Sequence, residues 1–186
     1  MKINIPEPDP KYFTKEEFEK MIAYCDNEVL KDAFTWAVFT GVREAELIKA
    51  KPSDVNVYKR IMKVYSTVSN PNKDKDSREI EMHKRLIPIF EKYKSQEFIF
   101  LNPNTNMQFT ARALLDGVTK ACKKAGLKHF TFKDLRSIYA TWLINADAPL
   151  KWISQQMGHS SLSITEKHYA KYITKEFRGE IDKLNF

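Results

Sequence analysis

The sequence predicts a mainly α domain with a small antiparallel β-sheet, an α+β fold. Apolar residues recur at helical spacing over most of the chain, and only residues 54–82 change to the alternation typical of β-strands. Hydrophobic residues make up 42% of the 186 residues, so the chain can bury a core of its own. The net charge of +7 favours a polyanionic partner such as nucleic acid. No apolar run approaches the roughly 18–20 residues of a membrane span, so we expect no membrane partner.

The first elements follow from local signals. Residues 1–13 are expected to form an extended linker, because three prolines stiffen them, and a linker at this point indicates a further domain upstream. A helix should begin at Thr14, which forms a capping box with Glu17. The next helix, over residues 28–40, is surrounded by apolar side chains and should be central and buried. Gly41 then supplies the left-handed residue that ends it.

The sheet and the remaining helices complete the domain. A short helix is expected over residues 44–50, before two or three strands within residues 54–82 and a turn over residues 69–77. Pro149 and Gly158 mark the start and the end of one later helix. The helices expected after the sheet cover residues 86–94, 110–125, about 135–143, 149–157, 162–171 and 174–184.

The two cysteines, Cys25 and Cys122, fall on the apolar faces of predicted helices. Buried free thiols are therefore expected, with neither a disulfide framework nor a metal site. The first ten residues contain three prolines and no apolar segment, so they do not form a signal peptide. These features together fit a reducing cytoplasm.

Two stretches in the first half of the chain carry charges that a core does not explain. Arg43 follows a helix end, and Glu46 lies one helical turn further on the same face. By itself this pair would be a surface ion pair of little energetic value. The turn over residues 72–78 contains Lys73 and Lys75, and by itself it would be a solvated charged turn.

Two further stretches lie in the second half. Lys133 and Arg136 share a helical face opposite the apolar residues, which leaves room for a phosphate, although such a pair is more often solvated surface. His159 directly follows a glycine that ends a helix, and Tyr169 comes ten residues later. A lone tyrosine is usually a half-buried packing residue, so only the combination of the four stretches points to chemistry.

In this order the four stretches resemble the signature of the tyrosine recombinases, the phage integrase family. The motifs are Thr-Gly-x-Arg-x-x-Glu at residues 40–46, a hairpin lysine, Leu-Arg at 135–136, and Gly-His-Ser-Ser at 158–161 followed by Tyr169. The resemblance covers roughly residues 14–172 and implies the catalytic-domain fold of these DNA breaking and rejoining enzymes. It also implies a site-specific recombinase (integrase) of a phage or another mobile element, which needs neither metal, cofactor nor ATP.

The resemblance assigns a role to each site residue. Tyr169 would attack the phosphorus and form a 3′-phosphotyrosine, with Tyr172 as the alternative nucleophile. Arg43 and Arg136 would hold the non-bridging oxygens, where negative charge develops in the transition state. Lys73 would give a proton to the leaving 5′ oxygen, with Lys75 as the second choice. His159 would donate a hydrogen bond to the phosphate, and Glu46 would orient the site.

One position departs from the family pattern. The family most often has histidine three residues before its second arginine, whereas this chain has Lys133. A lysine with an ordinary pKa near ~10.4 is a poor base, although it can still donate a hydrogen bond to phosphate or tyrosinate. Type IB topoisomerases are similar in accepting lysine there. The departure leaves open which group takes the tyrosine proton.

The domain and partner assignments follow. Residues 14–173 are expected to form the catalytic domain, and residues 174–186 a C-terminal helix or tail that docks on a neighbouring protomer. The resemblance implies double-stranded DNA as the partner, a homotetramer on DNA, and room for accessory DNA-bending proteins. Two alternatives stay open: a type IB topoisomerase that relaxes supercoils by the same chemistry, and a DNA-binding module without catalytic activity.

Overall fold

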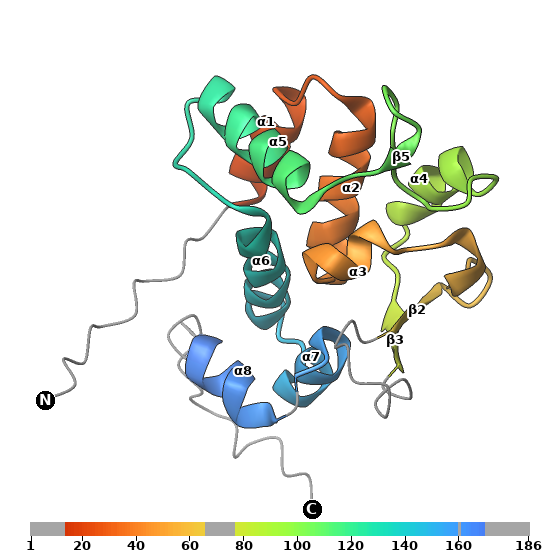
Figure 1. The fold of residues 1–186 in the computed structure, drawn as a ribbon. Coiled ribbons are helices and arrows are strands. Elements are labelled where there is room, and N and C mark those ends of the chain that lie inside the picture. Colours follow the sequence, from red (N-terminus) through yellow and green to blue (C-terminus); the bar gives the residue numbers. More distant parts are fainter. Residues whose placement is uncertain (1–13, 66–76, 160, 170–186) are drawn as a thin grey trace, which may run out of the picture.

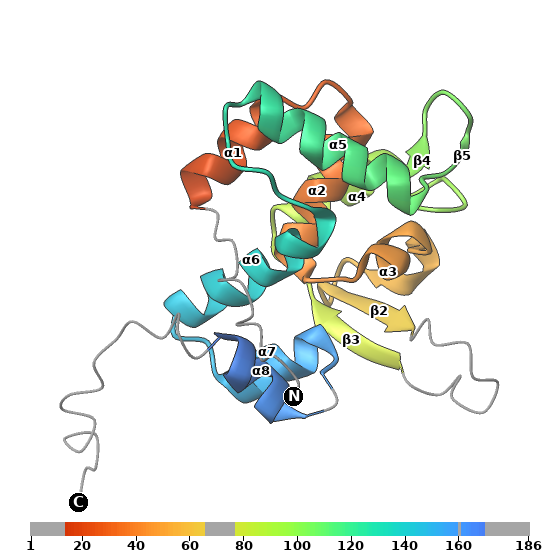
Figure 2. The same cartoon turned by 60° about the vertical axis from the view of Figure 1, so that its left-hand side comes forward.

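A computed structural model describes residues 14–65, 77–159 and 161–169, and Figures 1 and 2 show it in two views. Its elements are α1 (Lys15–Ala23), α2 (Glu28–Thr40), α3 (Glu44–Ile48), the 3-10 turn η1 (Pro52–Asp54), β1 (Val55–Asn56), β2 (Ile61–Tyr65), β3 (Ser77–Glu81), α4 (Leu86–Tyr93), β4 (Leu101–Asn102), β5 (Met107–Gln108), α5 (Ala111–Lys124), α6 (Phe132–Asn145), α7 (Leu150–Met157) and α8 (Leu162–Tyr169). The predicted mainly α fold with a small antiparallel sheet is confirmed. The expected linker, most of the turn over residues 69–77 and the helix over residues 174–184 lie outside the described residues.

The capping signals read from the sequence are present. The Thr14 hydroxyl accepts a hydrogen bond from the Glu17 backbone N–H at 3.1 Å, and the Glu17 carboxylate accepts one from the Thr14 N–H at 2.9 Å. Gly41 ends α2 with a φ of 64°, and Gly158 ends α7 with a φ of 65°. Since only glycine adopts this conformation without strain, both helix ends are fixed by the sequence.

Helix α2 is the central element of the main core, as its apolar surroundings predicted. Phe34 and Trp36 are fully buried, and the Trp36 ring meets Phe100 edge to face at 5.7 Å between centroids. Each such side chain contributes about 1.5–3 kcal/mol by leaving water. Helix α6 packs along α2, while α1 packs against α5.

The sheet lies beside this helical core. Strands β1, β2 and β3 are antiparallel in that order, and β2 pairs with β3 from Ile61 opposite Glu81 to Tyr65 opposite Ser77. Alternate residues Met62, Val64 and Ile80 are buried, which explains the strand periodicity of the sequence. A second hairpin, β4–β5, was not predicted.

Helix α6 connects the main core to a smaller one. Both views show α7 and α8 at the end of α6 that lies away from α1 and α5 (Figures 1 and 2). The smaller cluster joins α6 to α7 through buried side chains, namely Tyr139, Ala140, Ile144, Ile153 and Met157. Helix α7 also contacts β3. This arrangement brings the C-terminal end of α7 next to α3, β3 and α6.

Cys25 and Cys122 are both buried, as predicted. Within the described ranges, His, Cys, Asp and Glu side chains do not gather in any group of three or more that could hold a metal ion. None of the helices in the described part of the chain has the length and apolar character needed to cross a membrane.

Candidate active site

Arg43 and Glu46 are held together at the start of α3. Arg43 is the N-cap residue, and its backbone N–H donates to Glu46 Oε2 at 2.7 Å, while its guanidinium Nη1 donates to Glu46 Oε1 at 2.8 Å. The predicted i,i+3 contact therefore forms. It is not a surface pair, because the Glu46 side chain is 0% exposed and only Arg43, at 44%, reaches solvent. The geometry fixes one edge of the Arg43 guanidinium.

A second arginine explains how Glu46 can be buried. Arg78 of β3 donates from Nη1 and Nη2 to the two Glu46 carboxylate oxygens, each at 2.8 Å. Burial by itself raises the pKa of Glu46, but the hydrogen bonds and positive charge of Arg78, joined by the hydrogen bonds from Arg43, outweigh it and hold the pKa at about 2. Glu46 is therefore ionised at any physiological pH.

Arg136 is positioned by α6. The helix begins at a capping box in which the Asp134 carboxylate accepts the Thr131 backbone N–H at 2.7 Å. One turn later, Arg136 donates from Nη1 to the carbonyl of Gly41 and from Nη2 to the carbonyl of Met157. Arg136 thus joins the end of α2 to the end of α7.

The last carbonyls of α7 accept hydrogen bonds from three different arginines. Arg78 Nε donates to Gln156 O at 2.8 Å, Arg136 to Met157 O, and Arg43 Nη2 to Gly158 O at 3.0 Å. Helix ends leave their final carbonyls without partners inside the helix and carry partial negative charge, so both hydrogen bonding and the dipole favour cations there. The end of α7 is therefore the common anchor of Arg43, Arg78 and Arg136.

His159 follows directly on this anchor. Its backbone N–H donates to Ser154 O at 3.0 Å, and its ring Nδ1 lies 2.8 Å from the Thr165 hydroxyl of α8, a fully buried group. Tyr169 is the last residue of α8, but its side chain lies outside the described part of the chain. The same is true of Lys73, Lys75 and Tyr172.

Three of the predicted cations surround one cavity. A pocket of about 340 Å³ is lined by Val42, Arg43, Glu44, Phe132, Lys133 and Arg136. Burial raises the pKa of the Glu44 carboxyl in this pocket. The structure thus brings Arg43, Lys133 and Arg136 together from segments far apart in the sequence, in a space that can receive an anion such as phosphate.

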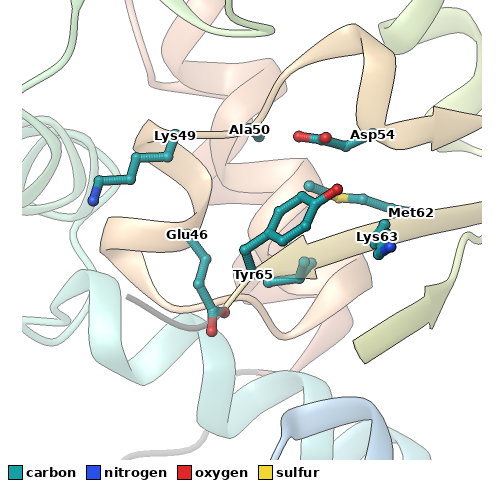
Figure 3. Close-up of a pocket in the computed structure, with 8 residues that line it drawn as sticks. Glu46, Lys49, Ala50, Asp54, Met62, Lys63 and Tyr65 are labelled. Carbon is teal, nitrogen blue, oxygen red and sulfur yellow. The ribbon is translucent and has the colours of Figure 1, made fainter. Parts of the chain in front are cut away.

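A smaller hollow lies on the other side of α3. It has a volume of about 180 Å³ and is lined by residues of α3, η1 and β2. Figure 3 shows Glu46 and Tyr65 on its wall, with the Lys49 amine pointing away from it. The ammonium of Lys63 lies 5.4 Å from the centre of the Tyr65 ring. Tyr65 is the last residue of β2 and the last described residue before residues 66–76.

Comparison with known proteins now identifies the family. The chain matches the model of the phage integrase family over residues 11–176. It belongs to the phage integrase family. Among curated members it is 27% identical to a XerC-like tyrosine recombinase of Caldanaerobacter subterraneus, over 96% of this chain and 55% of that protein. It is 29% identical to the tyrosine recombinase XerA of Pyrococcus horikoshii, over 96% of this chain and 63% of the relative. The chain therefore spans between half and two thirds of these relatives.

Solved structures of the family share the fold. The crystal structure of XerA recombinase aligns with a TM-score of 0.74 at 23% identity, over 96% of this chain and 65% of that one. The Tn1549 transposon integrase in complex with transposon right end DNA aligns with a TM-score of 0.75 at 21% identity, over 98% and 68%. At these identities the likeness establishes the tyrosine recombinase catalytic-domain fold.

Arg78 is a residue of the site that the sequence did not point to. A signal was present in the strand alternation, because Arg78 shares a face of β3 with the buried Ile80. An arginine on the inward face of a strand needs a buried acceptor. Glu46 is that acceptor, but only the tertiary structure pairs the two residues.

Proposed function

We propose that this chain is the catalytic part of a site-specific DNA recombinase, which cleaves and rejoins DNA strands through a 3′-phosphotyrosine intermediate. One observation carries the proposal: Arg43 and Arg136 come from different helices and line a single cavity, and both donate to carbonyls of the two residues that precede His159. A phosphodiester in this cavity would meet two guanidinium groups, which stay charged at all relevant pH values.

The arginines would supply most of the transition-state stabilisation. Negative charge grows on the non-bridging oxygens as the phosphorus becomes pentacovalent, and preorganised donors there are worth about 3 kcal/mol each in the barrier. Arg43 and Arg136 are preorganised by the α7 carbonyls that they already contact. Little rearrangement is therefore required when phosphate binds.

His159 would donate a further hydrogen bond to a non-bridging oxygen. That role needs a proton on Nε2, so the Thr165 hydroxyl should donate to Nδ1 across the observed 2.8 Å. Thr165 would thereby select the ring tautomer, and Glu46 would orient Arg43 without reacting.

Tyr169 would be the nucleophile, with Tyr172 as the alternative. Its oxygen attacks phosphorus, the bond to the 5′ oxygen breaks, and Lys73, or Lys75 in second place, gives that oxygen a proton. The phosphotyrosine retains the bond energy, so rejoining by the 5′ hydroxyl needs no ATP. Lys133 would donate a hydrogen bond in the cavity, and the acceptor of the tyrosine proton stays open.

Double-stranded DNA is the proposed partner, in a homotetramer that leaves room for accessory DNA-bending proteins. The chain's positive charge and the DNA-bound state of the Tn1549 integrase relative support DNA binding. Residues 174–186, outside the described part, are proposed to dock on a neighbouring protomer. If the chain lacking these residues assembles on DNA as well as the intact chain does, that docking is wrong.

The decisive experiment traps the covalent intermediate. The chain is incubated with a pool of nicked duplexes that carry randomised sequence, and adducts that resist denaturant are recovered and sequenced. The wild type should yield adducts on a defined sequence, whereas Tyr169→Phe should yield none because it keeps the ring but lacks the attacking oxygen. Adducts from the phenylalanine variant would move the nucleophile to another residue.

Two results would favour other functions. If the wild type binds the pool but forms no adduct, the chain is a DNA-binding module without catalytic activity. If it relaxes a supercoiled plasmid that lacks the selected sequence, topoisomerase activity replaces recombination. Recombination between two copies of the selected sequence on one plasmid would complete the case for the recombinase.

A further inference from the structure

Arg78 uses its guanidinium to join three segments of the chain. It lies on β3 opposite Val64, and only 16% of its side chain is exposed. Its Nη1 and Nη2 grip both oxygens of Glu46 in α3, and its Nε donates to Gln156 O at the end of α7, all at 2.8 Å. A paired fork of this kind fixes direction as well as distance.

Both parts of the chain that Arg78 contacts, Glu46 and the end of α7, also form hydrogen bonds with Arg43. Glu46 Oε1 accepts from Arg43 Nη1, and Oε2 accepts the Arg43 backbone N–H. The other side of the Arg43 guanidinium donates to Gly158 O, two residues after the carbonyl that Arg78 holds. Two groups therefore set the direction of the Arg43 guanidinium. The first is the Glu46 carboxylate, which Arg78 contacts directly. The second is Gly158 O, two residues after the Gln156 carbonyl that Arg78 contacts.

The charges indicate a second effect. Glu46 is a buried carboxylate shared by two arginines. If Arg43 were its single partner, the positive charge of Arg43 would be offset by Glu46 and would attract phosphate weakly. Because Arg78 also compensates Glu46, the cluster of the three side chains keeps one net positive charge, and the more exposed of the two arginines is Arg43.

Packing leaves Arg78 little freedom to take another position. Gly158 has a φ of +65°, and a Cβ there would lie 2.9 Å from both Cδ and Nη1 of Arg78. The arginine therefore rests directly against the backbone that precedes His159. A shift of Arg78 would move that backbone or lose the contact.

We propose that Arg78 is a positioning residue of the active site: it aims Arg43 at the phosphate and keeps the charge of Arg43 available, without touching DNA itself. This inference rests on the proposed function, and it adds to the expected site a residue from the sheet. It predicts that Arg78 variants bind DNA normally but react slowly.

The first measurement needs no DNA. In protein labelled with ¹⁵N-arginine, the Nη signals of Arg43 should be separate in the wild type, since bonds on both sides of the guanidinium restrict its rotation. They are assigned by their loss in Arg43→Lys. Arg78→Lys keeps a charge beside Glu46, but a lysine cannot contact Glu46 and Gln156 O at the same time. In this variant the guanidinium of Arg43 should rotate more freely, and its separate Nη signals should average. Arg112→Gln is the matched control, because Arg112 forms an exposed ion pair on α5.

The second measurement is the rate of adduct formation at saturating DNA, on the sequence selected by the wild type. Arg78→Lys and Arg78→Gln should lower this rate about 10- to 100-fold, the scale of a misplacement of about 1 Å, with DNA affinity unchanged. Arg112→Gln should react at the wild-type rate. If Arg78→Gln does not fold, Arg78→Lys decides both measurements.

Either of two results overturns the inference: separate Arg43 signals in the Arg78 variants, or wild-type reaction rates in them. The inference is also overturned if Arg78→Gln reacts slowly while Arg78→Lys reacts at the wild-type rate, because a positive charge at this position would then suffice. If the wild type forms no adduct, the proposed function fails, while the Arg43 signals still decide whether Arg78 positions Arg43.

Discussion

Replacement of Gly158 by alanine measures how tightly Arg78 packs against the end of α7. The left-handed backbone at Gly158 costs an alanine about 1 kcal/mol relative to glycine. The new methyl would also lie 2.9 Å from Arg78 Cδ and Nη1, so the guanidinium must shift. Since hydrogen bonds to charged groups contribute about 1.5–3 kcal/mol each, weakening the three that Arg78 makes should cost about 2 kcal/mol more. The total expected loss is about 3 kcal/mol.

Gly126→Ala is the control, because Gly126 has the same φ of +65° but no atom within 4 Å of the added Cβ. It should lose only the backbone contribution of about 1 kcal/mol. Urea unfolding at pH 7, with equal slopes for all variants, gives the two free energies of unfolding. If Gly158→Ala and Gly126→Ala are equally stable, Arg78 does not pack against Gly158 and the reasoning fails.

Three further predictions concern other groups. The pKa of Glu46 in the folded protein is lowered from 4.5 to about 2, so the ionised carboxylate contributes about 3 kcal/mol to the free energy of unfolding above pH 4.5 and loses this contribution as the pH falls to about 2. The urea midpoint should therefore fall less steeply between pH 6 and pH 2 for Glu46→Gln than for the wild type. Parallel curves would contradict this. Asp32→Ala leaves the buried Tyr93 hydroxyl without its 2.7 Å acceptor and should cost about 2–3 kcal/mol. Because burial and then Asp32 raise the pKa of Tyr93, the variant should also lower that pKa in an alkaline absorbance titration, whereas an unchanged titration would exclude the contact. Lys133→His should make the adduct rate depend on pH near about 6.5; a flat profile would show that the side chain at this position does not exchange the tyrosine proton.

The fold was predicted well where local signals act alone. The bounds of α2 at residues 28–40 are those expected from its apolar surroundings and Gly41, and the Thr14–Glu17 capping box is present. The β4–β5 hairpin was missed because each strand has only two residues, too few to establish an alternation. Short elements are defined by their pairing partners, which a sequence pattern does not contain.

For the site, the sequence indicated which residues take part but not how deeply they are buried. Arg43 and Glu46 look like a solvated pair because helical spacing says nothing of what covers the helix. Arg78 covers it, from a strand that lies far away in the sequence. Likewise, helical spacing on α5 does not show that Lys120 and Lys124 both contact Asp26 of another segment. The roles assigned to Lys73 and Tyr169 stay predictions, because their side chains lie outside the described residues.

Under the proposed chemistry, the arrangement at the end of α7 determines at what stage of folding the chain could cleave DNA. Because β3, α3 and α6 each send one arginine to consecutive carbonyls of the same helix, the catalytic alignment arises only after all four elements have docked. An incompletely folded molecule keeps its surplus of lysines and can still adhere to a chromosome. It lacks the aligned arginines. Under the proposed chemistry, a nascent or damaged molecule would therefore bind DNA without cleaving it.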